Sequence, residues 1–84
     1  MKLIFSKHSW DEYLYWQNTD NKIVKRINIL IRAIERTPYE GIGKPEPLKH
    51  SLSGYWSRRI TDQHRIVYKV DNGSVIIAQL RYHY

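Results

Sequence analysis

The clearest pattern of hydrophobic and polar positions in the chain lies between Asn21 and Thr37. Apolar residues recur there at helical spacing and form one stripe over about three turns. The stripe consists of Ile23, Val24, Ile27, Leu30, Ile31 and Ile34. It predicts an amphipathic helix that ends at Thr37-Pro38, because the residue before a proline disfavours the helical backbone region. The lysines and arginines off the stripe form either an ordinary solvated face or a contact surface for RNA or an acidic partner.

A short strand and another helix are expected before this one. Leu3-Ile4-Phe5 is a strand candidate. Ser6 or Ser9 can cap the helix that follows, and Ser9 has the capping-box spacing to Glu12. The apolar positions of that helix are Trp10, Tyr13 and Leu14. The polar run Asn18-Thr19-Asp20-Asn21 then breaks the pattern and offers N-cap candidates for the second helix.

The segment from Pro38 to Gly54 is expected to be irregular. It holds three prolines and three glycines in seventeen residues, and both residue types disfavour helix and strand. Loops of this length in small domains are usually functional or disordered. Prolines flank Glu46 on both sides and bias it towards an extended conformation, which would hold its carboxylate still.

Three strands are expected in the rest of the chain, at Tyr55–Thr61, Arg65–Val70 and Val75–Tyr82. Their even positions are mostly apolar and their odd positions mostly polar, and side chains alternate between the two faces of a sheet. We therefore assign the even positions to the core: Trp56, Ile60, Ile66, Tyr68, Val70, Ile76, Ala78, Leu80 and Tyr82. Three odd positions are apolar exceptions: Val67, Val75 and Ile77.

Keeping all even positions on one face requires an even sum for each cross-strand pair, and hence loops of odd length. Asp71-Asn72-Gly73 fits a three-residue hairpin loop with its glycine in the left-handed region, and Asp62-Gln63-His64 could serve in the same way. The sequence thus predicts an α+β fold in which two N-terminal helices pack on one face of a twisted antiparallel sheet, with residues 3–5 as an added strand. The other face would carry Arg59, Arg65, Arg81 and His83.

Composition narrows the chemistry that is open to the chain. The 84 residues suit a single domain, 1–84, with a thin core. The absence of cysteine excludes disulfides, thiol nucleophiles and cysteine-ligated zinc. No stretch is long enough for a signal peptide or a membrane span, so we expect a soluble cytoplasmic protein. The net charge of +6 and the isoelectric point of 9.7 are typical of nucleic-acid binders, although acidic proteins and anionic membranes would also be attracted.

Cleavage of an RNA strand by its own 2′-hydroxyl is one reaction that these residues could support. It needs a base for the hydroxyl proton, an acid for the leaving 5′-oxygen and fixed positive charge at the phosphate, and it requires no metal or cofactor. Glu46 is the candidate base, and His83 is the candidate acid because histidine titrates near neutrality. The candidate cations are Arg65, Arg59 and Lys49.

Each candidate also has a structural interpretation that the sequence leaves open. Glu46 could be a solvated loop residue, and the last two residues could belong to a frayed end. Both arginines could form surface ion pairs with Asp62 or Asp71. Three singly placed histidines are expected to be structural or exposed: His8, His50 and His64.

Several runs of residues resemble those of the YoeB (Txe) toxins, a branch of the RelE-like toxin family. They are Gly43–His50, Leu52–Ile60, His64–Tyr68 and Arg81–Tyr84, and the helical run Trp10–Trp16 is similar as well. The resemblance covers essentially the whole chain. It implies the RelE/microbial-ribonuclease fold, with helices packed on a twisted antiparallel sheet. It also implies an endoribonuclease that cuts mRNA in the ribosomal A site and stops translation.

The resemblance further implies roles for single residues. Glu46 matches the general base, Arg65 the arginine that stabilises the transition state, and His83 the general acid. Tyr84 matches a terminal tyrosine that helps to position the substrate and could share the acid role. The phosphate-contacting positions of the family correspond to Lys49 and Arg59. The products would be a 2′,3′-cyclic phosphate and a free 5′-hydroxyl.

The partners implied by the resemblance are mRNA on the ribosome, ribosomal RNA and a YefM-type antitoxin whose acidic C-terminal segment covers the toxin. Toxin homodimers also occur in the family. Two other functions stay open at this point. One is a non-catalytic module that binds RNA or the ribosome, and the other is an interaction protein, such as an operon co-repressor that acts only with an antitoxin.

Overall fold

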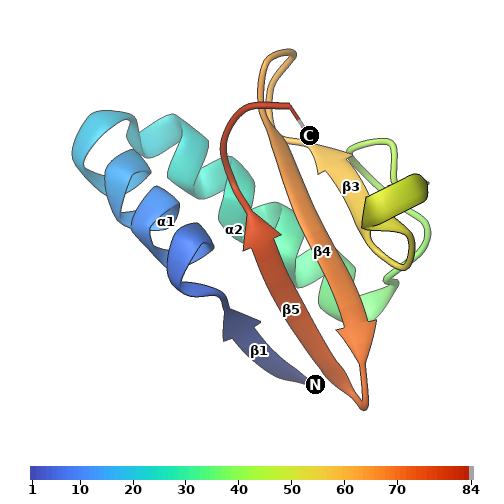
Figure 1. Cartoon of the computed structure of the whole chain (residues 1–84). Coiled ribbons are helices and arrows are strands. Elements are labelled where there is room, and N and C mark those ends of the chain that lie inside the picture. The colour runs from blue at the N-terminus through green and yellow to red at the C-terminus, as the bar shows by residue number, and fades with distance from the viewer. Residues whose placement is uncertain (84) are drawn as a thin grey trace.

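Two helices pack against one face of a five-stranded sheet with the strand order β1-β5-β4-β3-β2 within residues 1–83 (Figure 1). The computed structural model describes those residues, so the predicted site residue Tyr84 lies outside the described part of the chain. In chain order the elements are β1 (Lys2–Phe5), α1 (Lys7–Thr19), α2 (Asn21–Arg36), β2 (Glu46–Pro47), the 3₁₀ helix η1 (His50–Leu52), β3 (Trp56–Arg59), β4 (Arg65–Asp71) and β5 (Ser74–Gln79). The predicted α+β arrangement is confirmed. No helix in residues 1–83 has both the length and the apolar character needed to cross a membrane.

The apolar stripe of α2 lies at the centre of the core, as predicted. Its residues Ile27, Leu30 and Ile34 are fully buried. Asp20 ends α1 and caps α2, because its side chain accepts the backbone N–H of Lys22 at 3.0 Å. The helix ends at Arg36, where the Thr37-Pro38 pair predicted its end.

α1 begins after Ser6, whose hydroxyl accepts the backbone N–H of Ser9 at 3.1 Å. Of the two predicted caps, Ser6 is therefore the one that forms. Ser9 lies inside the helix, so the predicted capping box between Ser9 and Glu12 is wrong. Both of these side chains are instead buried, and both bond to the backbone of the chain around β5.

The sheet is mixed rather than antiparallel throughout. β1 pairs in parallel with β5, whereas the other neighbouring strands pair in the antiparallel manner that the sequence predicts. β1 and β5 are remote in sequence, so no hairpin turn forces them to be antiparallel. Glu46 and Pro47 form a short edge strand against β3, within the segment that was expected to be irregular. A proline is compatible with an edge strand, because one side of such a strand makes no ladder hydrogen bonds.

The β4–β5 hairpin corrects the predicted assignment of faces. Its loop consists of Asn72 and Gly73, whose φ angles of 48° and 75° are those of a type I′ turn, so the predicted three-residue loop is wrong. The first half of β5 therefore turns its odd positions to the core: Val75 and Ile77, both fully buried. A register shift beside Val67 then restores the predicted parity, because Val67 pairs with Gln79.

β5 also ends earlier than predicted, at Gln79 instead of Tyr82. Leu80 is still fully buried, as its even position predicted. The even position of Tyr82 predicts a core side chain, and this prediction is wrong, because Tyr82 is 57% exposed and has a φ of 62°. The chain has left the sheet at this point, so the alternation of a strand no longer decides where its side chains lie.

Arg58 is a buried charge that fixes the loop after α2. Its side chain is fully buried, and its Nη2 donates to the carbonyl oxygens of Thr37 at 2.6 Å and Glu40 at 2.9 Å. Nη1 donates to the carbonyl of Ile42 at 3.1 Å, and Nε donates to the hydroxyl of Tyr68 at 3.2 Å. The guanidinium thus ties the loop to β3 and β4 just before the chain enters β2.

We expect Arg58→Met to lower the free energy of unfolding by about 3 kcal/mol or more. The substitution leaves several buried acceptors without a donor, and each such loss costs roughly 1–3 kcal/mol. Urea denaturation followed by circular dichroism measures the change. Arg36→Met, at an exposed arginine of α2, is the matched control and should stay within about 0.5 kcal/mol of the unsubstituted chain. A loss below about 1 kcal/mol for Arg58→Met would contradict this role.

Candidate active site

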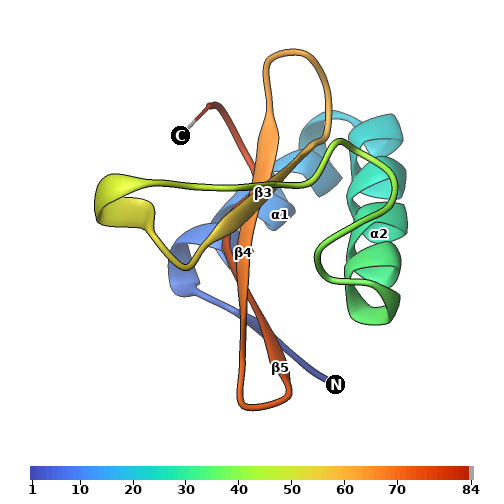
Figure 2. The ribbon, with the colours of Figure 1, turned by 90° about the vertical axis from the view of Figure 1, so that its right-hand side faces the viewer.

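The face of the sheet opposite α2 carries three of the predicted site residues: Glu46, Arg59 and Arg65. Figure 2 shows the sheet nearly on edge, with α2 on one side and with η1 and the segment that follows β5 on the other. Backbone pairing forms a row of residues across β2, β3, β4 and β5: Glu46, Ser57, Val67 and Gln79. Residues that pair across strands share a face of the sheet, so the side chain of Glu46 belongs to this row.

Arg59 and Arg65 form the next pair on the same face. They are paired with each other across β3 and β4, and Arg59 follows Ser57 by two residues. From strand geometry, the Cα atom of Glu46 lies roughly 8 Å from that of Arg59 and roughly 12 Å from that of Arg65. Long side chains at these separations can reach one phosphodiester group from opposite sides. The predicted grouping of the two arginines on one face is therefore found, with Glu46 beside them.

Arg65 is a largely buried cation with a fixed side chain. It is 7% exposed, and its Nη1 donates to the carbonyl oxygens of Thr61 at 2.7 Å, Asp62 at 3.1 Å and His64 at 3.1 Å. Within residues 1–83, neither arginine of the pair forms a salt bridge with an aspartate, so the ion-pair interpretation does not hold. The positive charge of Arg65 is held in place by neutral groups.

Lys49 lies on the segment that leaves β2 and folds over the same side of the sheet (Figure 2). Its side chain is exposed, whereas its neighbour Leu48 is buried. The backbone N–H of Leu48 donates to the carbonyl of Tyr55 at 2.9 Å, which continues the pairing of β2 and β3 by one residue. Leu48 therefore holds the start of this segment, and Lys49 is presented to solvent beside the row.

The C-terminal segment is held by α1 at the point where β5 loses its neighbour β1. The last pair between β1 and β5 is at Ile77, and the hydroxyl of Ser9 donates to the Ile77 carbonyl at 2.7 Å. The backbone N–H of Leu80 donates to Oε1 of Glu12 at 2.8 Å, and Nε1 of Trp16 donates to the Leu80 carbonyl at 2.9 Å. Side chains of one helix thus take the place of a neighbouring strand.

Tyr82 is fixed at both of its backbone groups, directly before His83. Its N–H donates to Nδ1 of His64 at 2.7 Å, and its carbonyl accepts from the backbone N–H of Arg65 at 3.0 Å. Its φ of 62° lies in the left-handed region, which a tyrosine occupies only when its surroundings hold it there. The backbone is therefore held as far as Tyr82, directly before His83. His83 is exposed and lies one residue beyond this double attachment.

His64 is a neutral imidazole in this arrangement. Its Nδ1 accepts a hydrogen bond and therefore carries no proton. Its ring meets the ring of Trp16 edge-on, with 4.8 Å between the centroids. Burial lowers the pKa of His64 below its usual value of 6.5, and the nearby Arg81 guanidinium lowers it further, whereas Glu12 raises it.

Arg81 packs against α1 instead of joining Arg59 and Arg65 as the sequence predicted. Its guanidinium lies 3.7 Å from the ring centroid of Tyr15 and 4.6 Å from that of Tyr82. The early end of β5 is the reason, because the alternation of a strand stops before residue 81. A depression of about 670 Å³ lies here and is lined by Tyr15, Trp16, Gln63, His64, Arg81, Tyr82 and His83.

Sequence reasoning missed the residues that hold the candidate site together. Ser9, Glu12 and Trp16 lie at i, i+3 and i+7 of α1 and therefore share one face of the helix. That spacing puts three polar groups on a buried face, which is the signal that could have identified them. No local pattern marks Arg58, because most of its partners are backbone carbonyls of a distant loop.

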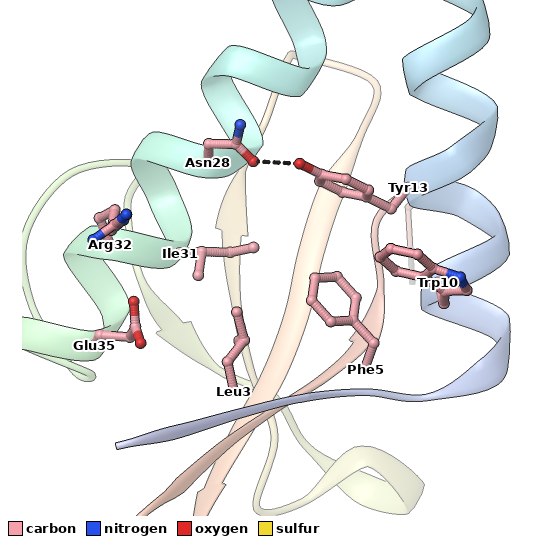
Figure 3. Close-up of a pocket in the computed structure, with 8 residues that line it drawn as sticks. All are labelled: Leu3, Phe5, Trp10, Tyr13, Asn28, Ile31, Arg32 and Glu35. Carbon is pink, nitrogen blue, oxygen red and sulfur yellow. Dashed lines mark hydrogen bonds between the residues drawn. The ribbon is translucent and has the colours of Figure 1, made fainter.

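A groove between β1, α1 and α2 lies away from these residues (Figure 3). Its volume is about 580 Å³, and it is lined by Leu3, Phe5, Trp10, Tyr13, Asn28, Ile31, Arg32 and Glu35. The rings of Trp10 and Tyr13 stack with 5.7 Å between their centroids, and the Tyr13 hydroxyl donates to Oδ1 of Asn28 at 2.8 Å. No candidate site residue within residues 1–83 lines this groove, so it is a separate, largely apolar surface.

Comparisons with known proteins find relatives over the full length of the chain. A family model described as the YoeB-like toxin of bacterial type II toxin-antitoxin system matches residues 5–84. The Toxin YoeB of Escherichia coli (strain K12) is 67% identical over 84 residues, which cover 100% of both chains. The YoeB/ParE toxin from Agrobacterium tumefaciens matches in structure with a TM-score of 0.96, at 52% identity and 100% coverage of both chains. A YoeB-YefM complex and a YoeB dimer from Staphylococcus aureus match with TM-scores of 0.92 and 0.93, at 47% and 48% identity, over 100% of this chain and 98% of theirs.

We expect Glu12→Ala to lower the free energy of unfolding by about 1–3 kcal/mol, because the buried N–H of Leu80 loses its acceptor. Glu12→Gln keeps a side-chain oxygen at the same place, so this matched control should lose much less. Chemical denaturation measures the stability, and amide hydrogen exchange at Leu80 locates the effect. Equal losses in the two variants, with unchanged exchange at Leu80, would show that this hydrogen bond does not hold the segment.

Proposed function

Because the chain belongs to the YoeB-like toxins of bacterial type II toxin-antitoxin systems, we propose that it is an endoribonuclease that cleaves mRNA in the ribosomal A site and thereby inhibits translation. One observation carries the proposal. A carboxylate and two arginines, Glu46, Arg59 and Arg65, share one face of the sheet, and within residues 1–83 the side chain of Arg65 donates to backbone carbonyls. Such a face suits the chemistry of a phosphodiester, because it offers a base beside fixed positive charge.

Glu46 is the general base in this proposal. Its carboxylate takes the proton of the 2′-hydroxyl, and the 2′-oxygen then attacks the adjacent phosphorus. Pro45 and Pro47 restrict the backbone on both sides of Glu46, and pairing with Ser57 holds it in β2. A base on a short edge strand is thus open to a large substrate while its backbone keeps one orientation.

Arg65 stabilises the negative charge that develops on the phosphate oxygens. Three carbonyls already fix its Nη1, so the guanidinium needs little reorganisation when that charge appears. Arg59 and Lys49 hold neighbouring phosphates. Both of these side chains are exposed, which suits contacts along a strand of RNA.

His83 is the general acid that protonates the leaving 5′-oxygen, and Tyr84 positions the substrate and shares this role. The bond between phosphorus and the 5′-oxygen breaks as the bond to the 2′-oxygen forms. The products are a 2′,3′-cyclic phosphate and a free 5′-hydroxyl, and the reaction needs neither a metal nor a cofactor. The attachment of Tyr82 supports this assignment, because it holds the backbone directly before the acid.

The openness of the candidate site favours a substrate that a larger assembly delivers. Glu46 and Lys49 lie on an exposed surface rather than in an enclosed cleft. A net charge of +6 promotes association with RNA in general. We therefore propose ribosomal RNA as a binding partner that supplies the remaining walls of the site around the mRNA, within the cytoplasm.

We further propose a YefM-type antitoxin as the protein partner. A relative from Staphylococcus aureus is solved as a YoeB-YefM complex, and another as a YoeB dimer, so both assemblies are candidates for this chain. An antitoxin with an acidic segment would complement the positive charge of the chain. The groove in Figure 3 exposes Leu3 and Trp10, which gives such a partner an apolar surface to cover.

Two other functions could use the same basic face. A non-catalytic module that binds RNA or the ribosome has no use for a carboxylate beside phosphates. It would keep or improve its binding when Glu46 is replaced by alanine. An operon co-repressor that acts only with its antitoxin would not depend on the C-terminal residues. Cleavage of mRNA on the ribosome by this chain, in the absence of any antitoxin, therefore separates the proposed function from both.

We expect purified protein to cut mRNA at A-site codons of translating ribosomes, and Glu46→Ala to abolish these cuts because the 2′-hydroxyl loses its base. Mapping of mRNA 5′ ends measures the cleavage, beside a reaction without ribosomes. Glu40→Ala, which removes an exposed carboxylate of the preceding loop, is the matched control and should cleave normally. Absence of cuts by a folded protein that binds ribosomes would leave the binding module as the better assignment.

We expect Arg65→Lys to reduce the cleavage rate on the order of a hundredfold, which is the usual effect of removing one donor to a transition-state charge. The single ammonium of lysine would be bound to the same carbonyls of the turn and could not also present a second nitrogen to the phosphate. Single-turnover cleavage at saturating ribosomes measures the rate, and Arg36→Lys is the remote control. A near-normal rate would argue against a transition-state role for the guanidinium.

A further inference from the structure

We propose that His64 is a positioning residue for the C-terminal segment, and that the charge of its imidazole decides whether the segment stays in place. The neutral ring holds the backbone of Tyr82, directly before His83, and protonation of the ring removes this hydrogen bond. The consequence for cleavage rests on the proposed function. The attachment itself does not, because it is a property of the folded chain that can be measured without RNA.

The geometry requires a single protonation state of His64. Its Nδ1 accepts the backbone N–H of Tyr82 at 2.7 Å, so the ring proton is on Nε2. A protonated imidazole carries hydrogens on both nitrogens and has no lone pair to offer. Nδ1–H would then face the Tyr82 N–H as a second donor, and an attraction would become a repulsion.

Tyr82 depends on this hydrogen bond more than an ordinary residue would. Its left-handed φ of 62° is unfavourable for a side chain with a Cβ atom, so its two backbone bonds oppose a local strain. The backbone N–H of Arg65 and the side-chain amide of Gln79 bind only its carbonyl, at 3.0 Å and 3.4 Å. Loss of the His64 bond frees the N–H end and allows the segment to return to an extended conformation.

His64 also touches the cation of the candidate site. Its carbonyl accepts from Nη1 of Arg65 at 3.1 Å and from the backbone N–H of Ile60 at 3.0 Å. One residue of the β3–β4 turn therefore holds the guanidinium with its backbone and the C-terminal segment with its side chain. The ring and the carbonyl act on different groups, so a substitution of the ring leaves the Arg65 contact available.

The charged groups around His64 come from every element that packs on it. Arg81 of the C-terminal segment and Arg65 of β4 oppose a positive charge on the ring, whereas Glu12 of α1 favours it. The turn adds Asp62, which lines a second depression on the other side of His64. Tyr15 and Tyr82 contribute phenol groups to the depression described above. Burial is the largest influence and lowers the pKa of His64 below 6.5. The neutral, holding state therefore predominates at pH 6.5 and above, and it is lost as the pH falls through the lowered pKa of the folded protein.

Two substitutions at position 64 separate the hydrogen bond from the titration. His64→Asn places an amide oxygen near the position of Nδ1, so it can accept the Tyr82 N–H but cannot be protonated. His64→Leu removes the acceptor and keeps an apolar side chain against Trp16. His50→Asn, at an exposed histidine whose φ of 59° asparagine tolerates well, is the control for loss of a histidine elsewhere.

The first measurement is the exchange protection of the Tyr82 amide by NMR between about pH 8 and about pH 5, corrected for the intrinsic exchange rate. In the unsubstituted chain and in His50→Asn, protection should fall together with the titration of the His64 ring nitrogens. In His64→Asn it should stay high at every pH, and in His64→Leu it should be low at every pH. The proposal would be overturned if the protection of the Tyr82 amide did not change as His64 titrates, or if it persisted in His64→Leu.

The second measurement compares cleavage by the unsubstituted chain and by His64→Asn on ribosomes over the same pH range. Their ratio cancels the effects of pH on the ribosome and on other groups of the site. It should fall by about tenfold or more as His64 becomes protonated, with the change in kcat rather than in KM. A ratio that is constant with pH would overturn the role in positioning for cleavage. If no variant cleaves mRNA while the protection of the Tyr82 amide still changes with the titration of His64, the attachment is supported and the proposed nuclease activity is rejected.

Discussion

The geometry of the chain end depends on how the backbone of β5 is satisfied after β1 stops. Leu80 is fully buried, and a buried N–H or carbonyl without a partner is strongly unfavourable. Within residues 1–83 no further strand lies at this edge, so Glu12 accepts the N–H and Trp16 donates to the carbonyl. Because both side chains come from α1, the first helix decides where the chain runs after β5. The segment that leaves β5 is thereby held in the folded structure as far as Tyr82.

Arg58 has the corresponding role on the other flank of the sheet. Its guanidinium collects carbonyls of the loop after α2 and thereby sets where the chain enters β2. Both flanks thus rely on side-chain bonds to backbone groups, because the segments that carry Glu46 and His83 have little or no ladder of their own. In a chain of 84 residues the helices and one sheet face take up most of the apolar surface, so polar side chains must hold the segments at the two flanks.

The sequence predicts the elements better than their fine register, for a physical reason. The α2 stripe and its two ends follow from local periodicity and from Asp20 and Pro38, so the helix is recovered closely. The faces of β5 are not recovered, because Asn72-Gly73 fits a two-residue or a three-residue loop equally well by composition. The choice between the two loops decides which face of the sheet each side chain of β5 lies on. The register shift beside Val67 then restores the predicted faces from Gln79 onward, and no local sequence pattern predicts this shift. Arg59 and Arg65 lie on one strand pair and were grouped correctly.

The residues that support the candidate site cannot be predicted from local sequence patterns, because their partners are distant in the chain. Glu12 has the spacing of a capping box, and only the packing of α1 against the end of β5 redirects it to Leu80. His64 looks like an isolated histidine in a turn, and it acquires a partner only because Tyr82 is brought back over β4. Residues on regular strands can be sorted by alternation, whereas residues that bind distant backbone groups are defined by the tertiary fold. The sequence therefore predicts the charged residues of the candidate site, and the structure adds the residues that hold their backbone and side chains in place.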